Sequence, residues 1–528
     1  MSVTLLSVDF LTTGLKWRPN TLSKTLNIKY FKSPVYFPSS SSISSSVLNL
    51  KSHYHQASPQ TNSTKHTTLL VETFHENQKL KDLLGKVRRN DSNLLQILKN
   101  EGDWTTDQFW AVVRFLKETS RFREVLQVFN VWKNIQKFRI NVLNYEKIIY
   151  LLTGAGLMDE ATILLQDMKS SGFIPTLGIY NCMIHGFAQK GEFEDALCYF
   201  KEMAGINLKP EIKTYNGLIQ AYGTYRMYDE MSKCVKKMES EGCFPDHITY
   251  NLLIAEFARG GLLKRMERVY KTLLSKRMGL QASTLVAMLE GYANLGILQK
   301  MEKTYRRVLY SKIPLKGDLV RKLAKVYIKN YMYSRLEDLG LDFASRMGVS
   351  DLVWCIRLLS QACLLSRKGM NHIIQEMAAE KSSWNVTVAN IIALAYLKMK
   401  DLRHLNMLLH EIQTRCVKPD IVTIGVFFDA EAIGFDGTIA LKVWRKIGLL
   451  QEAVEMDTDP LVLTAFGKGH FLRSCEEMYS SLEPKDRQKK IWSYKDLIVS
   501  VLKHSGRNSC ILGTKTDPVA YQKKVSSL

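Results

Sequence analysis

The chain has 528 residues, of which 46% are hydrophobic, and it carries a formal net charge of +22 with a pI of about 9.4. This hydrophobic content can bury a substantial core, although a single compact domain of such length would normally divide. The positive charge suits a polyanionic partner, either a nucleic acid or an anionic membrane surface. No apolar stretch reaches the roughly 18 residues of a membrane-spanning helix, so we predict no membrane span.

The first 70 residues differ in composition from the rest of the chain. They contain 14 Ser, nine Thr and seven Lys or Arg, but Asp9 is their only acidic residue. A basic, hydroxyl-rich and acid-poor leader is typical of an organelle transit peptide. Because Arg18 is its only arginine, we favour the chloroplast, with the mitochondrion as the alternative location. The other interpretation is a merely disordered tail. Residues 71–106 are predicted to form an N-terminal helical cap.

From residue 142 onward, several residue types recur at an interval of 35. The recurring tyrosines are Tyr145, Tyr180, Tyr215 and Tyr250. On the same interval lie Gly156, Gly191, Gly261 and Gly296 (with Arg226 at the missing position), Pro175, Pro210 and Pro245, and Met168, Met203 and Met238. A period of this length predicts a solenoid built from a duplicated structural unit.

Each unit shows two amphipathic helical patterns, which residues 177–211 illustrate. Tyr180, Ile184 and Phe187 mark one face of a first helix, and Gly191 provides its C-terminal stop. Acidic residues then favour the start of a second helix, and Pro210 closes the unit because proline cannot continue a helix. We therefore predict an all-α fold, a right-handed α-solenoid superhelix of helix–turn–helix repeats.

We expect the array to span residues 107–420 in about nine repeats. The pattern is degenerate over 282–385 and strong again over 386–420. The spacing of Asn251 and Asn390 is one residue less than four periods, which indicates a short unit at 317–350. Residues 421–528 are predicted to hold one more degenerate repeat, then a helical cap with a helix near 492–503 and an irregular tail.

The sequence offers no candidate catalytic or metal site. None of the 11 histidines begins an H-x-E motif, and the nine cysteines form no C-x-x-C pair. His410-Glu411 lacks the second histidine of a zinc protease motif, and no phosphate-binding loop is present. We therefore predict a protein that is not an enzyme and has no cofactor, with cysteines that stay as free thiols in a reducing compartment.

The units resemble pentatricopeptide repeats, of the pure 35-residue class found in plant organelles. Thr214-Tyr215-Asn216 and Thr249-Tyr250-Asn251 match the opening of that repeat, and Lys209-Pro210-Glu211 and Lys418-Pro419-Asp420 match its close. The similarity covers residues 107–420, about 60% of the chain. The related tetratricopeptide repeat has a period of 34, which the four tyrosines do not fit.

The resemblance implies binding of single-stranded RNA, with one base contacted per repeat by two or three side chains. In the family, the residue after the tyrosine and the last residue of the repeat face the base. The corresponding pairs are Asn181 with Glu211, Asn216 with Asp246, Asn251 with Gln281, and Asn390 with Asp420. Asn followed by Asp implies a uracil preference, and the other two pairs imply a pyrimidine. The alternative is that each Asn only borders or caps a helix.

Two further features bear on RNA binding. In the family, a branched apolar residue near the start of a repeat sandwiches bases; Ile248, Leu143 and Leu352 keep it, whereas Gly178, Lys213 and Ser283 do not. Residues 262–330 hold 16 Lys or Arg against four acids, and Lys264, Arg265 and Arg268 recur there at helical spacing. Such side chains attract phosphates without selecting a sequence.

The resulting hypothesis is a non-catalytic adaptor in an organelle. It would bind single-stranded organellar RNA, with a preference for uracil, during transcript processing, stabilisation or intron splicing, and would have possible protein partners in a ribonucleoprotein. The competing hypothesis is a protein-interaction scaffold with nonspecific RNA affinity, in which the degenerate units bind a partner.

Overall fold

A computed structural model describes residues 81–82, 85, 105–135, 140–311, 313–481 and 492–504. Regular structure within these ranges is helical, apart from one isolated β-bridge between Ala453 and Ser493. The predicted leader, almost all of the predicted N-terminal cap and the tail after residue 504 lie outside the described residues. The array divides into two compact units, 33–288 and 289–528, which are described separately.

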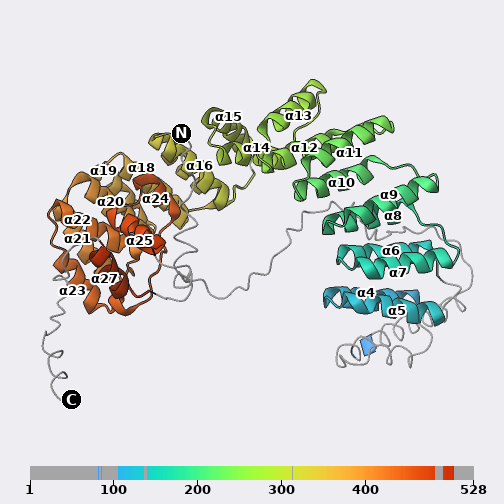
Figure 1. The fold of residues 1–528 in the computed structure, drawn as a ribbon, viewed down its shortest axis with the longest axis horizontal. Helices are drawn as coiled ribbons and strands as arrows, with labels where there is room; N and C mark the ends of the chain where they lie inside the picture. Colours follow the sequence, from blue (N-terminus) through green and yellow to red (C-terminus); the bar gives the residue numbers. More distant parts are fainter. Residues whose placement is uncertain are drawn as a thin grey trace, which may run out of the picture. The chain divides into compact units, whose positions relative to one another are not determined.

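In the unit 33–288, the described residues from 105 onward form successive helix pairs (Figure 1). They are α4 (Thr106–Glu118) and α5 (Phe122–Ile135), α6 (Val142–Gly154) and α7 (Met158–Ser170), α8 (Leu177–Lys190) and α9 (Phe193–Gly205), α10 (Ile212–Thr224) and α11 (Tyr228–Ser240), and α12 (His247–Arg259) and α13 (Leu263–Ser275). The unit ends within α14 (Ala282–Asn294). From α6 onward, each first helix begins at the first residue of a 35-residue sequence repeat.

The first helices form one continuous layer. The chain of contacts runs from α6 to α8, from α8 to α10 and from α10 to α12, while each second helix packs mainly against its own first helix. Figure 1 shows the corresponding order of stacked pairs. Because each pair buries its apolar faces against its own partner and its neighbours, the repeats share one elongated core, as expected for a solenoid. This confirms the predicted all-α helical-repeat fold.

The recurring tyrosines tie the two layers together. The hydroxyl of Tyr145 donates to Asp167 Oδ2 on α7 at 2.9 Å, and that of Tyr180 donates to Glu202 on α9 at 2.7 Å. Tyr215 makes the same kind of bond to Glu241. The rings of these three tyrosines are fully buried, so each phenol fills the core and still reaches a polar partner at its edge.

The recurring glycines lie at the turn between the two helices of a repeat. Gly156, Gly191 and Gly261 have φ values of 78°, 87° and 70°, a left-handed conformation that glycine adopts without steric cost. Arg226, which takes the place of glycine on this interval, adopts the same conformation with φ of 60°. The turn geometry is therefore set by the repeat and is imposed on a residue that disfavours it.

The unit 289–528 continues the helix pairs. They are α15 (Leu298–Tyr310), α16 (Gly317–Lys329) and α17 (Tyr333–Met347), α18 (Asp351–Cys363) and α19 (Arg367–Ala379), and α20 (Val386–Met399) and α21 (Leu402–Thr414). The helices α16 and α18 begin 34 residues apart, at Gly317 and Asp351, so the short repeat lies where the sequence pattern places it. The contacts between α18, α20 and α22 continue a first-helix layer in this unit.

The C-terminal part, for which the sequence predicts a degenerate repeat and a helical cap, consists of several short helices within the described residues. After α22 (Ile421–Ala430), η2 (Glu431–Ile433) and α23 (Gly437–Lys446) come η3 (Leu449–Gln451), α24 (Pro460–Phe466), α25 (His470–Ser481) and α27 (Tyr494–His504). The helix α25 packs on α22 and α27, which closes the end of the layer. The short α24 instead contacts the first helices α16, α18 and α20.

The strained turn yields a stability prediction. Replacing Arg226 by Gly removes the steric penalty of the left-handed conformation, and we expect the free energy of unfolding to rise by about 1 kcal/mol. Chemical denaturation of the purified protein measures this change. The control is Arg226→Ala, which keeps the β-carbon and should give no comparable gain. Equal stabilisation by both variants would contradict the explanation.

Candidate nucleic-acid interface

The two members of each predicted base-contacting pair lie at fixed places in the fold. The asparagine is the fifth residue of a first helix, and the last residue of the repeat is the N-cap of the following first helix. Because adjacent first helices pack together, this N-cap lies beside the preceding asparagine. Thus Asn181 Nδ2 donates to Glu211 Oε1 at 3.3 Å, and Asn390 Nδ2 donates to Asp420 Oδ1 at 2.9 Å.

Between the adjacent first helices α10 and α12, Thr249 connects Asn216 to Asp246. The Thr249 hydroxyl lies 2.8 Å from Asn216 Oδ1 and 2.9 Å from Asp246 Oδ1. Asp246 Oδ1 also accepts the Thr249 amide at 2.8 Å, which caps α12. Asn216 is half-buried, and neither its Nδ2 amide nor Asp246 Oδ2 has a partner among the described residues. One donor and one acceptor of this pair therefore bind no other described residue.

The Asn181–Glu211 pair, between α8 and α10, is similar, but its two side chains also bind each other. Thr214 donates its hydroxyl to Asn181 Oδ1 at 2.7 Å, as Thr249 does for Asn216. Here, however, the Asn181 amide already binds Glu211. Both members of this pair are half-buried. Part of the amide's donor capacity remains, because Nδ2 carries two hydrogens.

Asn251 differs from the predicted arrangement. It is buried, with 1% of its surface exposed, and its Nδ2 donates to the carbonyls of His247 at 2.7 Å and Gly279 at 2.9 Å. Its Oδ1 accepts the backbone amide of Gln281 at 2.7 Å, whereas the Gln281 side chain is exposed. Asn251 thus binds the backbone of the segment that leads into α14. This is the helix-bordering role, the alternative to a base contact.

Asn390 also departs from the expectation of an open position. It is fully buried, and Nδ2 donates to Thr458 Oγ1 at 2.7 Å as well as to Asp420. Its Oδ1 has no hydrogen-bond partner within the described part of the chain. Asp420 is buried too, and it caps α22 by accepting the Val422 and Thr423 amides at 3.0 and 3.1 Å. The chain itself therefore surrounds this pair.

Exposed apolar side chains stand near the starts of some first helices. Ile248 is 47% exposed, on the turn that also carries Asp246 and Thr249. Leu143 occupies the equivalent place on α6 and is 62% exposed. Such side chains offer an apolar surface against which an unpaired base can stack. The structure thus leaves Ile248 available beside the Asn216–Asp246 pair.

The predicted basic residues lie on the second helices. Lys264 and Arg268 are exposed on α13, whereas Arg265 pairs with Asp229 on α11 at 2.9 Å. The asparagine pairs belong to the first-helix layer. Lys264, Arg265 and Arg268 therefore belong to the other helical layer than the candidate base-contacting positions.

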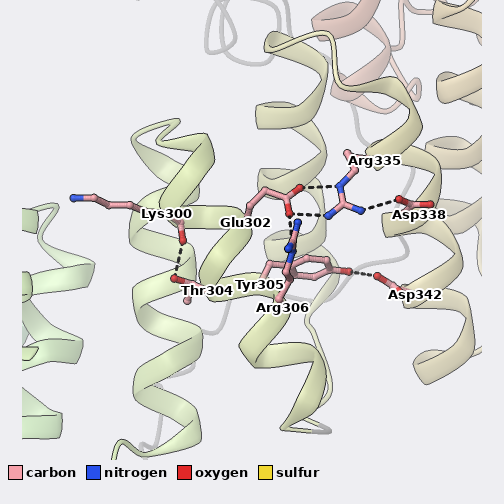
Figure 2. Close-up of polar contacts among 8 residues, drawn as sticks. All are labelled: Lys300, Glu302, Thr304, Tyr305, Arg306, Arg335, Asp338 and Asp342. Atoms are coloured by element: carbon pink, nitrogen blue, oxygen red, sulfur yellow. Dashed lines mark hydrogen bonds and ion pairs between the residues drawn. The ribbon is translucent and has the colours of Figure 1, made fainter. Parts of the chain in front are cut away.

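In the other unit, several basic side chains are engaged by acids (Figure 2). Arg335 Nη2 donates to Glu302 Oε2 at 2.8 Å and its Nη1 to Asp338 at 3.0 Å, while Arg306 lies 3.7 Å from Glu302. Burial opposes ionisation of Glu302, but the bonds from Arg335 and Tyr327 outweigh it and lower its pKa. Figure 2 also shows Lys300 extending away from these acids.

Within the described ranges, no group of three or more His, Cys, Asp or Glu residues is arranged to hold a metal ion. The same residues include no helix that is long and apolar enough to cross a membrane. The arrangement thus offers hydrogen bonding, stacking and electrostatic attraction along the helical layers.

These features define a helical-repeat protein with polar pairs recurring along one layer. The chain belongs to the pentatricopeptide repeat family. The PPR repeat family matches residues 175–224 and 210–259, and the PPR repeat matches 147–173 and 248–278. The chain is 56% identical over 445 residues to the chloroplastic pentatricopeptide repeat-containing protein At4g14190 of Arabidopsis thaliana, covering 84% of this chain and 88% of the relative. This relative confirms the predicted chloroplast location.

Solved structures of similar fold have low sequence identity. Maize PPR10 has a TM-score of 0.42 at 17% identity, with 78% of this chain and 61% of that chain covered. Yeast Rmd9p in complex with a 16-nt target RNA has a TM-score of 0.33 at 10% identity, with coverages of 82% and 94%.

Sequence reasoning missed the threonines that position the asparagines. Thr214 and Thr249 are both fully buried, and each binds the carbonyl oxygen of the asparagine one repeat earlier. The signal was present, because threonine precedes tyrosine in both T-Y-N motifs. The contribution of Thr458 had no such signal, since it lies 68 residues from Asn390.

His185 provides a pH-dependent test of first-helix packing. It lies on α8 against α10, so that a β-carbon added at Gly217 would come within 2.0 Å of its ring. Burial lowers its pKa from the ordinary 6.5, although hydrogen bonds to backbone carbonyls of residues 213 and 214 oppose the shift.

As the pH falls below 6.5, the unfolded chain therefore takes up a proton before the folded protein does, and the free energy of unfolding should decrease. Urea denaturation between pH 7.5 and 5 measures the slope. The His185→Gln variant should lose this part of the pH dependence. An identical slope in both proteins would rule out the assignment.

Proposed function

We propose that the protein binds single-stranded chloroplast RNA through the first-helix layer of the unit 33–288. It acts without catalysis, as an adaptor in transcript processing, stability or intron splicing. The carrying observation is the half-buried Asn216 near Asp246, with an amide donor and a carboxylate acceptor that bind no other described residue. Membership of the pentatricopeptide repeat family supports the proposal.

The chemistry of this pair favours uracil. Uracil presents a carbonyl acceptor beside its N3–H donor, so the Asn216 amide can donate to the first while Asp246 Oδ2 accepts from the second. Cytosine has an unprotonated N3, which would face the Asp246 carboxylate without a hydrogen to share. Ile248 supplies an apolar surface next to the base. The Asn181–Glu211 pair offers similar groups and is proposed to accept a pyrimidine.

A variant in which both members of this pair are replaced, which we call the code swap, tests this assignment. We expect Asn216→Thr combined with Asp246→Asn to shift the base selected at one position from uracil toward adenine, because the new amide can donate to adenine N1 and accept from its amino group. A good paired contact discriminates by about 1–3 kcal/mol. Selection from a random RNA pool measures the preference, and an unchanged selected sequence would defeat the base-contacting role.

The basic residues of α13 are proposed to attract RNA without selecting its sequence. Replacing Lys264, Arg268 and Lys271 by Gln should lower the affinity for all RNA sequences to a similar extent. It should also reduce the salt dependence of binding. The effect should be small above about 0.1 M salt, where charges act over only about 10 Å. Fluorescence anisotropy across a salt series measures it. A changed base preference would place these side chains at the bases instead.

Failure of both experiments would favour the scaffold hypothesis. If the code swap and the charge substitutions both leave RNA binding unaltered, the half-buried asparagines serve only the packing of the first helices. Sequencing of RNA that co-purifies with the protein from chloroplasts would then show no enriched transcript. A single enriched transcript would support the adaptor function and name its target.

A further inference from the structure

The segment of residues 456–466, which we call the C-terminal strap, lies on the first-helix layer of the unit 289–528. Its helical part, α24, contacts α16, α18 and α20, which belong to three consecutive repeats. Leu461 and Val462 are buried, with 3% and 0% of their surface exposed. The strap therefore covers the layer that carries Asn390.

The first residues of the strap bind both members of the predicted base-contacting pair Asn390–Asp420. The Thr458 hydroxyl accepts from Asn390 Nδ2 at 2.7 Å and donates to Asp420 Oδ2 at 2.6 Å. The backbone amides of Asp457 and Thr458 donate to the same carboxylate oxygen at 3.1 and 3.0 Å. An acceptor for the amide and a donor for the carboxylate are the groups that a uracil edge would bring, so Thr458 satisfies the pair in its place.

Two further contacts anchor the strap to other helices. Arg321 on α16 pairs through Nε with Asp459 Oδ2 at 2.8 Å. The Asp459 amide donates to Thr387 Oγ1 on α20 at 3.0 Å, and the Asp459 side chain caps α24 by accepting the Leu461 amide at 2.9 Å. The strap is thus bound at its beginning by hydrogen bonds and along α24 by apolar packing.

The space left beside the strap is unfavourable for a phosphate backbone. A groove of about 850 Å³ remains, and its charged lining residues are Asp318, Asp351, Asp457, Asp459, Arg321 and Lys418. Arg321 is engaged by Asp459, and Lys418 pairs with Glu452 at 2.8 Å and Glu455 at 2.7 Å. The groove thus has four aspartates, and its two basic side chains are already paired with acidic ones. This lining would repel the phosphates of RNA.

We propose that the C-terminal strap is an intramolecular occupant of this layer, which confines base recognition to the unit 33–288. Thr458 replaces a base at the Asn390–Asp420 pair, and the strap remains in place when RNA binds. This inference rests on the proposed RNA-binding function. It removes one of the two Asn–Asp pairs from the expected target sequence and leaves Asn216–Asp246 as the pair that selects uracil.

Paired code swaps in the full-length protein test the proposal. Asn390→Thr with Asp420→Asn should leave the sequence selected from a random RNA pool unchanged, whereas Asn216→Thr with Asp246→Asn should shift one position. A shift at a second position in the first variant would overturn the proposal. If neither variant shifts the selection, the proposed function itself fails. Thermal unfolding of both variants shows whether they retain the fold.

Hydrogen exchange on the unaltered protein decides the question even if the buried pair tolerates no substitution. The amides of Asp457, Thr458 and α24 should exchange at the same rate with and without a saturating uridine-rich oligonucleotide, because the strap does not leave. Faster exchange of these amides on RNA binding would show displacement and overturn the proposal. Binding of the oligonucleotide is followed in the same samples by anisotropy, which separates this result from a failure to bind RNA.

Discussion

The capping of first helices such as α12 and α22 by the last residue of the preceding repeat is the interaction on which the rest depends. Asp246 starts α12 by accepting the Thr249 amide, and Asp420 starts α22 in the same way. Such caps contribute about 1 kcal/mol each. Because the first helices pack side by side, the cap also stands next to the asparagine one repeat earlier. A helix-starting residue and a potential base contact are therefore the same side chain.

Asparagines in similar motifs nevertheless differ in burial and in hydrogen bonding. The T-Y-N sequences at Thr214 and Thr249 are alike. Among the described residues, however, the side-chain amide of Asn216 has no partner, whereas that of Asn251 donates to two backbone carbonyls. At Asn390 the C-terminal strap supplies Thr458 as a second acceptor for the side-chain amide. Residue type and place in the repeat therefore do not decide whether the side chain of an asparagine at this position is buried and bonded. The neighbouring segments that contact it do.

The two helical layers also divide the electrostatics. The polar pairs belong to the first helices, and the exposed Lys264 and Arg268 belong to a second helix. The amphipathic pattern of a second helix directs its charged side chains away from the shared core. In the function that we propose, charge on that layer attracts RNA, while selection among bases uses the hydrogen bonds of the other layer.

The sequence by itself determined the repeat, the helix starts and the turn positions, because these follow from local rules. Pro210, Gly191 and the recurring tyrosines mark helix ends and core positions wherever they occur. It also named the pairs that meet, since a 35-residue period puts each cap beside the same neighbour. Only the tertiary structure decided which pairs are open. The hydrogen bond that engages Asn390 outside the repeats comes from Thr458, which is distant in sequence and belongs to no repeat, so no local pattern could have revealed it.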